Sequence, residues 1–208
     1  MELRPVVDIH IIQPILLHIN VYNTSLQFSS LISSSLVRLT VCLHGSCQRR
    51  SSSLAFGCLN IRSLNNKLDD LLEVRRDQAI DVLCLVETWH DADSVCIRRL
   101  RMSGDQVVDK PRPRNADDLS VNHGGVAIVA GQGIRLSPVT VAVDAPSTFE
   151  YTAARTVDGS FAATIVVVYR PGSQAVQWSF YDEFAALLEV IEVRQERVFI
   201  VGDHQHPV

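Results

Sequence analysis

Four apolar runs of the sequence each end on a side chain that can do acid–base or hydrogen-bonding chemistry. The runs AFGCLN, VLCLVE, TIVVVY and VFIVGD end on Asn60, Glu87, Tyr169 and Asp203. A single polar residue at a strand end is an ordinary structural feature. Four such ends at one edge of a sandwich would instead gather two carboxylates, an amide and a phenol in one site.

This set of groups suits one kind of reaction. Carboxylate oxygens are hard ligands for Mg²⁺, which keeps several waters and binds through one or two carboxylates plus a substrate phosphate. Such an ion polarises a phosphoryl oxygen, while a second carboxylate takes a proton from attacking water. An amide and a phenol can donate hydrogen bonds to the phosphate as negative charge builds on it. The four residues together therefore predict phosphoester hydrolysis.

The elements that must position these residues begin at Leu54, where the sequence becomes regular. Gly202 is expected to end the last strand. Many strands with few helices between them predict a mixed α/β fold, in which packed sheets are covered by helices. Strand patterns occupy 54–60, 81–87, 124–130, 134–143, 149–157, 161–169 and 197–203.

Two stretches have the periodicity of helices. Leucines recur on one face of 65–78, and 178–193 is amphipathic. The spacing in the second stretch predicts an inward face that consists of Trp178, Tyr181, Ala185, Leu188 and Ile191.

Composition limits the class of protein. The 208 residues are 47% hydrophobic and 20% charged, which is enough to bury a sizeable core. The net charge of −4 argues against a general affinity for nucleic acid through bulk charge. The five cysteines have no paired CxxC spacing, so neither a disulfide framework nor a zinc site is indicated. Cys58 and Cys84 lie in apolar runs and are expected to be small buried residues, which favours a reducing, intracellular compartment.

Residues 1–53 differ from the rest of the chain. No charged residue occurs between Asp8 and Arg38, but prolines, asparagines and serines interrupt every apolar stretch there. A membrane span is therefore not expected, because it needs about 18 or more uninterrupted apolar residues. The segment is predicted to be a poorly specified extension, with 46–53 as a linker to the domain at 54–208.

A basic segment, 98–114, permits two interpretations. It is either a solvated charged loop or a local contact to a phosphate backbone, and the sequence leaves both open. Its six cations are Arg98, Arg99, Arg101, Lys110, Arg112 and Arg114.

Three other residues adjoin the polar strand ends or the glycine pair Gly124–Gly125. His90 and His123 have no partner at metal-ligand spacing and are expected to be surface or loop histidines. Trp89 either packs over the site or covers the core, and the second role is the default for a tryptophan.

Five blocks of the sequence resemble a known family in the family's own order. The family is the endonuclease/exonuclease/phosphatase superfamily, and in particular the apurinic-endonuclease-like domains of non-LTR retrotransposons. The resemblance implies a four-layered α/β sandwich, with two mixed sheets packed together and helices outside, incomplete at its C-terminus. The blocks are LNIRSLNNK at 59–67, LCLVETW at 83–89, HGGVAIV at 123–129, VYRPG at 168–172 and FIVGDHQHP at 199–207.

The resemblance also implies a role for each site residue. Asn60 is similar to an asparagine that arranges the metal and the phosphate, and Glu87 resembles the principal metal ligand. Tyr169 resembles a tyrosine that hydrogen-bonds the scissile phosphate. Asp203 is similar to the aspartate of a GDxN element, which orients or deprotonates the attacking water, and Gln205 stands where that element has asparagine.

The implied function is Mg²⁺-dependent nicking of DNA, with Mn²⁺ as an alternative ion and no small-molecule cofactor. DNA is the implied partner, no membrane is involved, and the implied location is intracellular, in the nucleus for a retrotransposon endonuclease. The family also carries a further aspartate and a Ser-Asp-His element downstream of the position of Val208, so weak or no activity is expected. Two alternatives stay open: a non-catalytic remnant, and a phosphatase or phosphodiesterase of the same superfamily.

Overall fold

The structure is a computed structural model of the chain. It describes residues 9–12, 26–30, 36–42, 53–113, 123–141, 145–158, 161–171, 176–192 and 197–204.

The described strands form two mixed sheets. In the six-stranded sheet the order is β2-β3-β4-β5-β7-β6, and only the pair β4 and β5 is parallel. Its strands are β2 (Leu26–Ser30), β3 (Leu36–Cys42), β4 (Ser53–Asn60), β5 (Val82–Val86), β7 (Val126–Ala130) and β6 (Gln106–Lys110).

The five-stranded sheet has the order β1-β11-β10-β9-β8. Here β11 runs parallel to both of its neighbours, and the other pairs are antiparallel. Its strands are β1 (Ile9–Ile12), β11 (Arg197–His204), β10 (Phe161–Arg170), β9 (Glu150–Asp158) and β8 (Arg135–Pro138).

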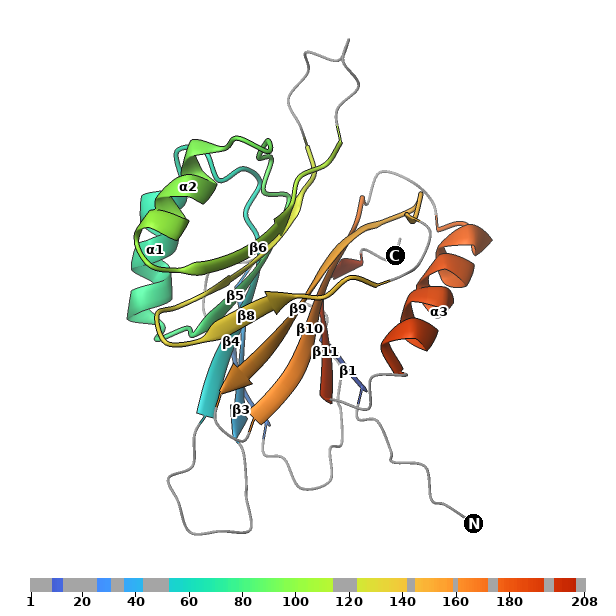
Figure 1. Ribbon diagram of the computed structural model, residues 1–208, viewed down its shortest axis with the longest axis horizontal. Helices are drawn as coiled ribbons and strands as arrows, with labels where there is room; N and C mark the ends of the chain where they lie inside the picture. Colours follow the sequence, from blue (N-terminus) through green and yellow to red (C-terminus); the bar gives the residue numbers. More distant parts are fainter. Residues whose placement is uncertain are drawn as a thin grey trace.

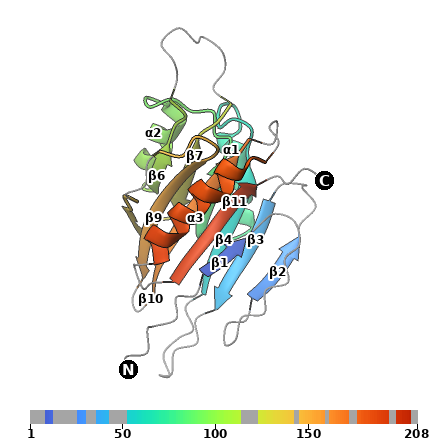
Figure 2. The same cartoon turned by 90° about the vertical axis from the view of Figure 1, so that its right-hand side faces the viewer.

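The sheets pack face to face, with helices on both outer faces. In Figure 1, α1 (Leu68–Asp77) and α2 (Val95–Met102) lie outside the six-stranded sheet, and α3 (Trp178–Glu192) lies outside the five-stranded one. Figure 2 shows α3 running along the strands that it covers. The expected four-layered α/β sandwich is therefore confirmed. Among the described helices, none combines the length and the apolar character needed to cross a bilayer.

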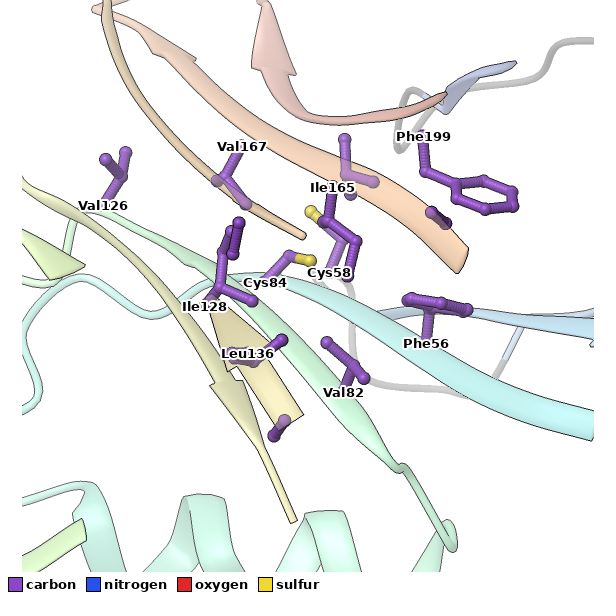
Figure 3. Packing of buried hydrophobic residues seen from close by; sticks show 14 of the residues in the cluster. Phe56, Cys58, Val82, Cys84, Val126, Ile128, Leu136, Ile165, Val167 and Phe199 are labelled. Atoms are coloured by element: carbon purple, nitrogen blue, oxygen red, sulfur yellow. The ribbon is translucent and has the colours of Figure 1, made fainter. Parts of the chain in front are cut away.

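Every second side chain along a strand points into the layer between the two sheets and helps to fill it. In β5 the side chains of Val82, Cys84 and Val86 enter this layer, while Leu83 and Leu85 face the helices. Figure 3 shows the layer from close by, with residues of both sheets interleaved and Phe56 stacked on Phe199. All of β5 is buried because both of its faces are covered.

The outer face of the five-stranded sheet corrects the predicted orientation of α3. Of the predicted inward face, Leu188 and Ile191 do pack on the sheet. The other three residues of that face are exposed, Trp178 at 84%, Tyr181 at 46% and Ala185, while Phe180 and Leu187 are buried against the sheet. Apolar residues at helical spacing lie on two adjoining faces of α3, and the spacing alone does not show which face is buried. In the structure, the face that contains Phe180 and Leu187 packs on the sheet. The side chains that it contacts there include Val166, Val168, Val198 and Ile200.

Two regions contain elements that the sequence pattern did not predict. Residues 9–42 contain β1, β2 and β3, whose pairing with β11 and β4 is long-range and leaves little local signal. The division into an extension and a domain at 54 stays a prediction. The basic segment is not a loop throughout, because residues 98–102 form the end of α2 and residues 106–110 form β6. Ser94 caps α2, and Ile97 and Leu100 anchor it.

Candidate active site

Strand alternation brings three of the four predicted residues to one end of the layer between the sheets. Tyr169 belongs to the set of β10 side chains that fill this layer. Asp203 lies two and four residues after Val201 and Phe199, which also enter the layer. Asn60 continues the series of Phe56 and Cys58 in the same way. Since β4, β10 and β11 end at the same edge, these side chains meet there.

Direct hydrogen bonds join all four residues. The Asn60 amide nitrogen Nδ2 donates to Glu87 Oε1 at 2.7 Å and to Asp203 Oδ2 at 3.1 Å. The Tyr169 hydroxyl donates to the same Glu87 oxygen at 3.0 Å. One amide thus bridges two carboxylates that come from opposite sheets, and the structure brings together the residues that the sequence singled out. Their catalytic roles are still a prediction.

Glu87 reaches this cluster only because the backbone leaves the strand. By alternation after Val86, its side chain would turn toward the helices. Instead Glu87 has φ of 52° and Trp89 has φ of 50°, a left-handed conformation that is uncommon for residues other than glycine. Such strained residues gather at functional sites and persist where their surroundings hold them.

A buried hydrogen-bond chain holds this turn. Thr88 Oγ1 lies 2.6 Å from His90 Nδ1, and His90 Nε2 lies 3.2 Å from Asp109 Oδ2. Asp109 in turn pairs with Arg101 of α2. His90 lies in the loop after β5 and is 2% exposed, so of the two expected settings, surface or loop, the loop is the one observed. Sequence reasoning missed its burial because its partner lies 19 residues away, on a strand that was not predicted.

Gly125 makes room for the same turn. It has φ of 92°, and a Cβ placed there would lie 2.6 Å from Thr88 Oγ1 and 3.2 Å from His90 Nδ1. The backbone N–H of Thr88 donates to the Gly125 carbonyl, and that of Trp89 donates to the Gly124 carbonyl. The two glycines therefore dock the Glu87 turn against the start of β7.

Gly202 positions Asp203 in a different way from the one expected. The strand does not end at this glycine, because β11 continues to His204. A Cβ at Gly202 would lie 1.7 Å from the Val168 carbonyl oxygen, so the residue is required for the close approach of β10. This approach sets Asp203 opposite Tyr169 in the parallel register.

The surroundings of the site keep its phenol and a nearby thiol neutral. Burial raises the pKa of Tyr169 well above its usual value, and the Glu87 carboxylate raises it further, while Arg112 opposes the shift. Tyr169 therefore stays a hydrogen-bond donor. Burial and the Asp203 charge raise the pKa of Cys58 to about 12, so this thiol is a small neutral core residue, as expected.

One of the predicted basic contacts adjoins the site. Arg112 pairs with Glu150, whose other oxygen accepts a 2.6 Å bond from the N–H of Gly125. Glu150 lies opposite Tyr169 in the β9–β10 register.

The remaining predicted cations do not form a single stripe. Arg98, Arg99 and Arg101 lie on α2, where Arg99 pairs with Asp69 of α1. Lys110 lies over the ring of Tyr151 at the end of β6. Arg114 is outside the described residues, as is the predicted catalytic Gln205.

Comparison with known proteins identifies the family of the chain. Residues 57–203, more than half of the chain, match the Endonuclease/Exonuclease/phosphatase family. The chain belongs to this family. The matched range begins in β4 and ends on Asp203, so it contains every site residue described above. No curated protein is similar enough to the chain to count as a match.

Solved structures share the architecture at low sequence identity. Danio rerio TDP2 in complex with single-strand DNA product has a TM-score of 0.52 at 12% identity, covering 72% of this chain and 60% of that one. The human Nocturnin catalytic domain with bound sulfate has a TM-score of 0.48 at 20% identity, covering 70% of this chain and 59% of that one. The endonuclease domain of TRAS1, a telomere-specific non-LTR retrotransposon, has a TM-score of 0.49 at 10% identity, covering 71% of this chain and 57% of that one. The chain thus spans less than two thirds of the length of these structures.

Enzymes of the endonuclease/exonuclease/phosphatase superfamily generally depend on divalent metal, and the donor set here fits a hard cation. Among the described residues no three His, Cys, Asp or Glu side chains cluster as a metal site. The oxygen donors are instead two carboxylates and one amide. Asn60 Oδ1 is buried and accepts no hydrogen bond from the described residues. The hydrogen bonds that Asn60 and Tyr169 donate to Glu87 both reach Oε1, which leaves Oε2 for a metal.

Proposed function

We propose that this domain hydrolyses phosphodiester bonds in DNA with Mg²⁺, as a nicking endonuclease of the non-LTR retrotransposon type. The observation that carries the proposal is the bridged pair of carboxylates, in which Asn60 donates to Glu87 and to Asp203 and Tyr169 donates to Glu87. A bridged pair of carboxylates beside a neutral phenol has the groups that phosphoryl transfer to water requires.

Each group has a distinct task in this proposal. Glu87 Oε2 and Asn60 Oδ1 would hold Mg²⁺, which when bound supplies positive charge for the phosphoryl oxygen and the leaving oxygen. Asp203 orients the attacking water and accepts its proton. Tyr169 donates its hydroxyl to a non-bridging phosphate oxygen, and its raised pKa keeps that proton in place.

DNA is the proposed substrate on two grounds. The ordered blocks from LNIRSLNNK to FIVGDHQHP are similar to the endonuclease domains of non-LTR retrotransposons. The TDP2 structure that shares this fold carries a single-strand DNA product, which supports testing DNA first. The proposed location is accordingly intracellular and, for a retrotransposon enzyme, nuclear.

Conversion of supercoiled plasmid to nicked circles in Mg²⁺ tests the proposal. Nicking is expected to fall at least about a hundredfold in Glu87→Gln and in Asp203→Asn, since each removes a charge from the centre of the reaction. Glu73→Gln and Asp70→Asn are matched controls, because they make the same chemical changes at exposed positions of α1. Full nicking by Glu87→Gln would contradict the proposal, and omission of the metal should abolish nicking.

An inositol phosphate assayed in parallel separates the alternatives. Release of phosphate from it without nicking of DNA would make the domain a phosphatase of the same superfamily. A folded chain that acts on neither substrate would be a non-catalytic remnant.

A further inference from the structure

Trp89 does not have the role that is usual for a tryptophan beside a sheet. It belongs to none of the three apolar clusters that make up the described core. Its ring is half-buried and meets the exposed imidazole of His123 edge-on, with the centroids 4.4 Å apart and the planes at 71°. Of the two roles considered for Trp89, packing over the site or covering the core, the contact with His123 supports the first, and the two rings form an aromatic pair.

The fold holds this aromatic pair next to the Glu87 carboxylate of the candidate active site. Trp89 lies two residues after Glu87, on the same left-handed turn, and Thr88 between them is fully buried. The N–H of Trp89 donates to the Gly124 carbonyl at 2.8 Å, and His123 directly precedes Gly124. The turn that presents Glu87 thus also fixes the position of the aromatic pair.

Two polar features distinguish this pair from an apolar docking patch. The indole N–H of Trp89 is buried and has no acceptor among the described residues. A buried donor without an acceptor is unfavourable unless a ligand or water satisfies it. The guanidinium of Arg112, which pairs with Glu150 through its Nε, lies against Gly124, where a Cβ would be 2.2 Å from that Nε. A flat ring surface, an unsatisfied donor and a cation therefore adjoin one another.

We propose that Trp89 and His123 form a stacking site for the nucleobase that neighbours the scissile phosphate, taken as an unpaired base. The inference rests on the proposed function and adds the subsite that binds the base. A nucleotide presents a flat π-face with hydrogen-bond acceptors at its edge and a phosphate beside it, which matches these three features. Stacking on aromatic side chains accepts every base, so the site would contribute affinity without sequence preference.

Tryptophan fluorescence tests the site without any need for catalysis. The chain has two tryptophans, so Trp178→Phe leaves Trp89 as the only indole, and Trp178 lies exposed on α3. The probe is a single-stranded DNA oligonucleotide with Ca²⁺ in place of Mg²⁺, compared with an abasic oligonucleotide of the same length and charge. The base-bearing strand should quench Trp89 and bind about tenfold more tightly than the abasic strand.

Two substitutions separate stacking from packing. Because both variants lack the Trp89 indole, binding is read here from the polarisation of a dye-labelled single strand. Trp89→Phe keeps a flat ring and should retain affinity for the base-bearing strand to within about threefold, whereas Trp89→Leu keeps apolar bulk and should lose about tenfold. Trp178→Leu is the matched control and should bind like the unmodified chain. Circular dichroism and thermal unfolding of each variant establish that the binding protein is folded.

The outcomes separate this inference from the proposed function. Equal binding of base-bearing and abasic strands, or equal affinities of Trp89→Leu and Trp89→Phe, would overturn the stacking site while leaving plasmid nicking as it is. Failure of the folded chain to bind either strand would overturn both the stacking site and the choice of DNA as substrate.

Discussion

Gly202 lies so close to Val168 that no side chain fits between them. A Cβ on Gly202 would be 1.7 Å from the Val168 carbonyl oxygen and 2.7 Å from its carbonyl carbon. The obstacle is backbone of the neighbouring strand, which cannot move without breaking the β10–β11 register. That register sets Asp203 opposite Tyr169. The position of both site residues therefore depends on the absence of a side chain at Gly202.

Gly202→Ala should therefore destabilise the fold by about 3 kcal/mol or more, because the added methyl group clashes with backbone atoms of Val168, and only a shift of the strands can relieve the clash. Gly133→Ala is the matched control. Gly133 has φ of 94° with nothing within 4 Å, so this change introduces backbone strain alone, about 1 kcal/mol. Urea unfolding of both variants measures the difference. Equal stabilities would show that the strands separate easily and that the close approach is not a constraint.

His90→Ala should cost about 2 kcal/mol of unfolding free energy, because it leaves the buried Thr88 hydroxyl and the Asp109 carboxylate without the imidazole between them. His123→Ala, at an exposed histidine of the same site, should change stability by less than about 0.5 kcal/mol. Chemical denaturation at neutral pH measures both. If the two variants lose the same stability, the hydrogen-bond chain from Thr88 through His90 to Asp109 does not hold the Glu87 turn.

The sequence alone singled out four residues that meet in the structure, because its strands are long apolar runs with abrupt polar ends. Alternation within β10 and β11 then determines that Tyr169 and Asp203 face the layer between the sheets. The position of Glu87 could not be predicted in the same way. Its orientation depends on a left-handed backbone conformation at a non-glycine residue, which only its surroundings stabilise.

Other features could not be predicted because their partners are distant in the sequence. The role of His90 depends on Asp109 in β6, an element hidden within a charged segment. The strand β1 is defined by its pairing with β11 at the opposite end of the chain. For α3, apolar residues lie on two adjoining faces, and only contact with the sheet shows that the face containing Phe180 is buried.

Glu183 should make stability depend on pH in the acid range. It accepts four hydrogen bonds, of 2.5 to 3.0 Å, from the N–H and hydroxyl groups of Ser147 and Thr148. Burial acts to raise its pKa, but these bonds outweigh burial and lower the pKa from 4.5 to about 2. As pH falls, the unfolded chain therefore takes up the proton first. The stabilisation is complete above about pH 4.5 and disappears as pH falls through about 2.

Glu183→Gln should thus lower the unfolding free energy by about 1 kcal/mol at pH 7, a value reduced by the partial exposure of the group. The deficit relative to the unmodified chain should shrink as pH falls from 4.5 to 2, because the Glu183 carboxyl of the unfolded chain takes up a proton in this range while that of the native chain stays charged until about pH 2. Glu189→Gln, an exposed position on the same helix, is the control and should show little deficit. A deficit that is constant from pH 7 to pH 3 would show that charge on Glu183 does not hold the 147–148 turn.

Asn60→Asp tests the bridge at the centre of the site by a nearly isosteric change. It removes the amide donor that lies 2.7 Å from Glu87 and 3.1 Å from Asp203, and it puts a third negative charge between them. In EDTA the variant should be less stable by about 2 kcal/mol, because like charges repel and two hydrogen bonds are lost.

Metal should reverse this loss, since a cation that binds only the folded site stabilises it by mass action. Added Mg²⁺ should therefore raise the melting temperature of Asn60→Asp more than that of the unmodified chain, as followed by differential scanning fluorimetry. Asn65→Asp, at an exposed position, adds the same charge away from the site and should respond to Mg²⁺ like the unmodified chain. If Asn60→Asp is destabilised and Mg²⁺ does not restore it, the bridge is a structural contact and the carboxylates hold no metal.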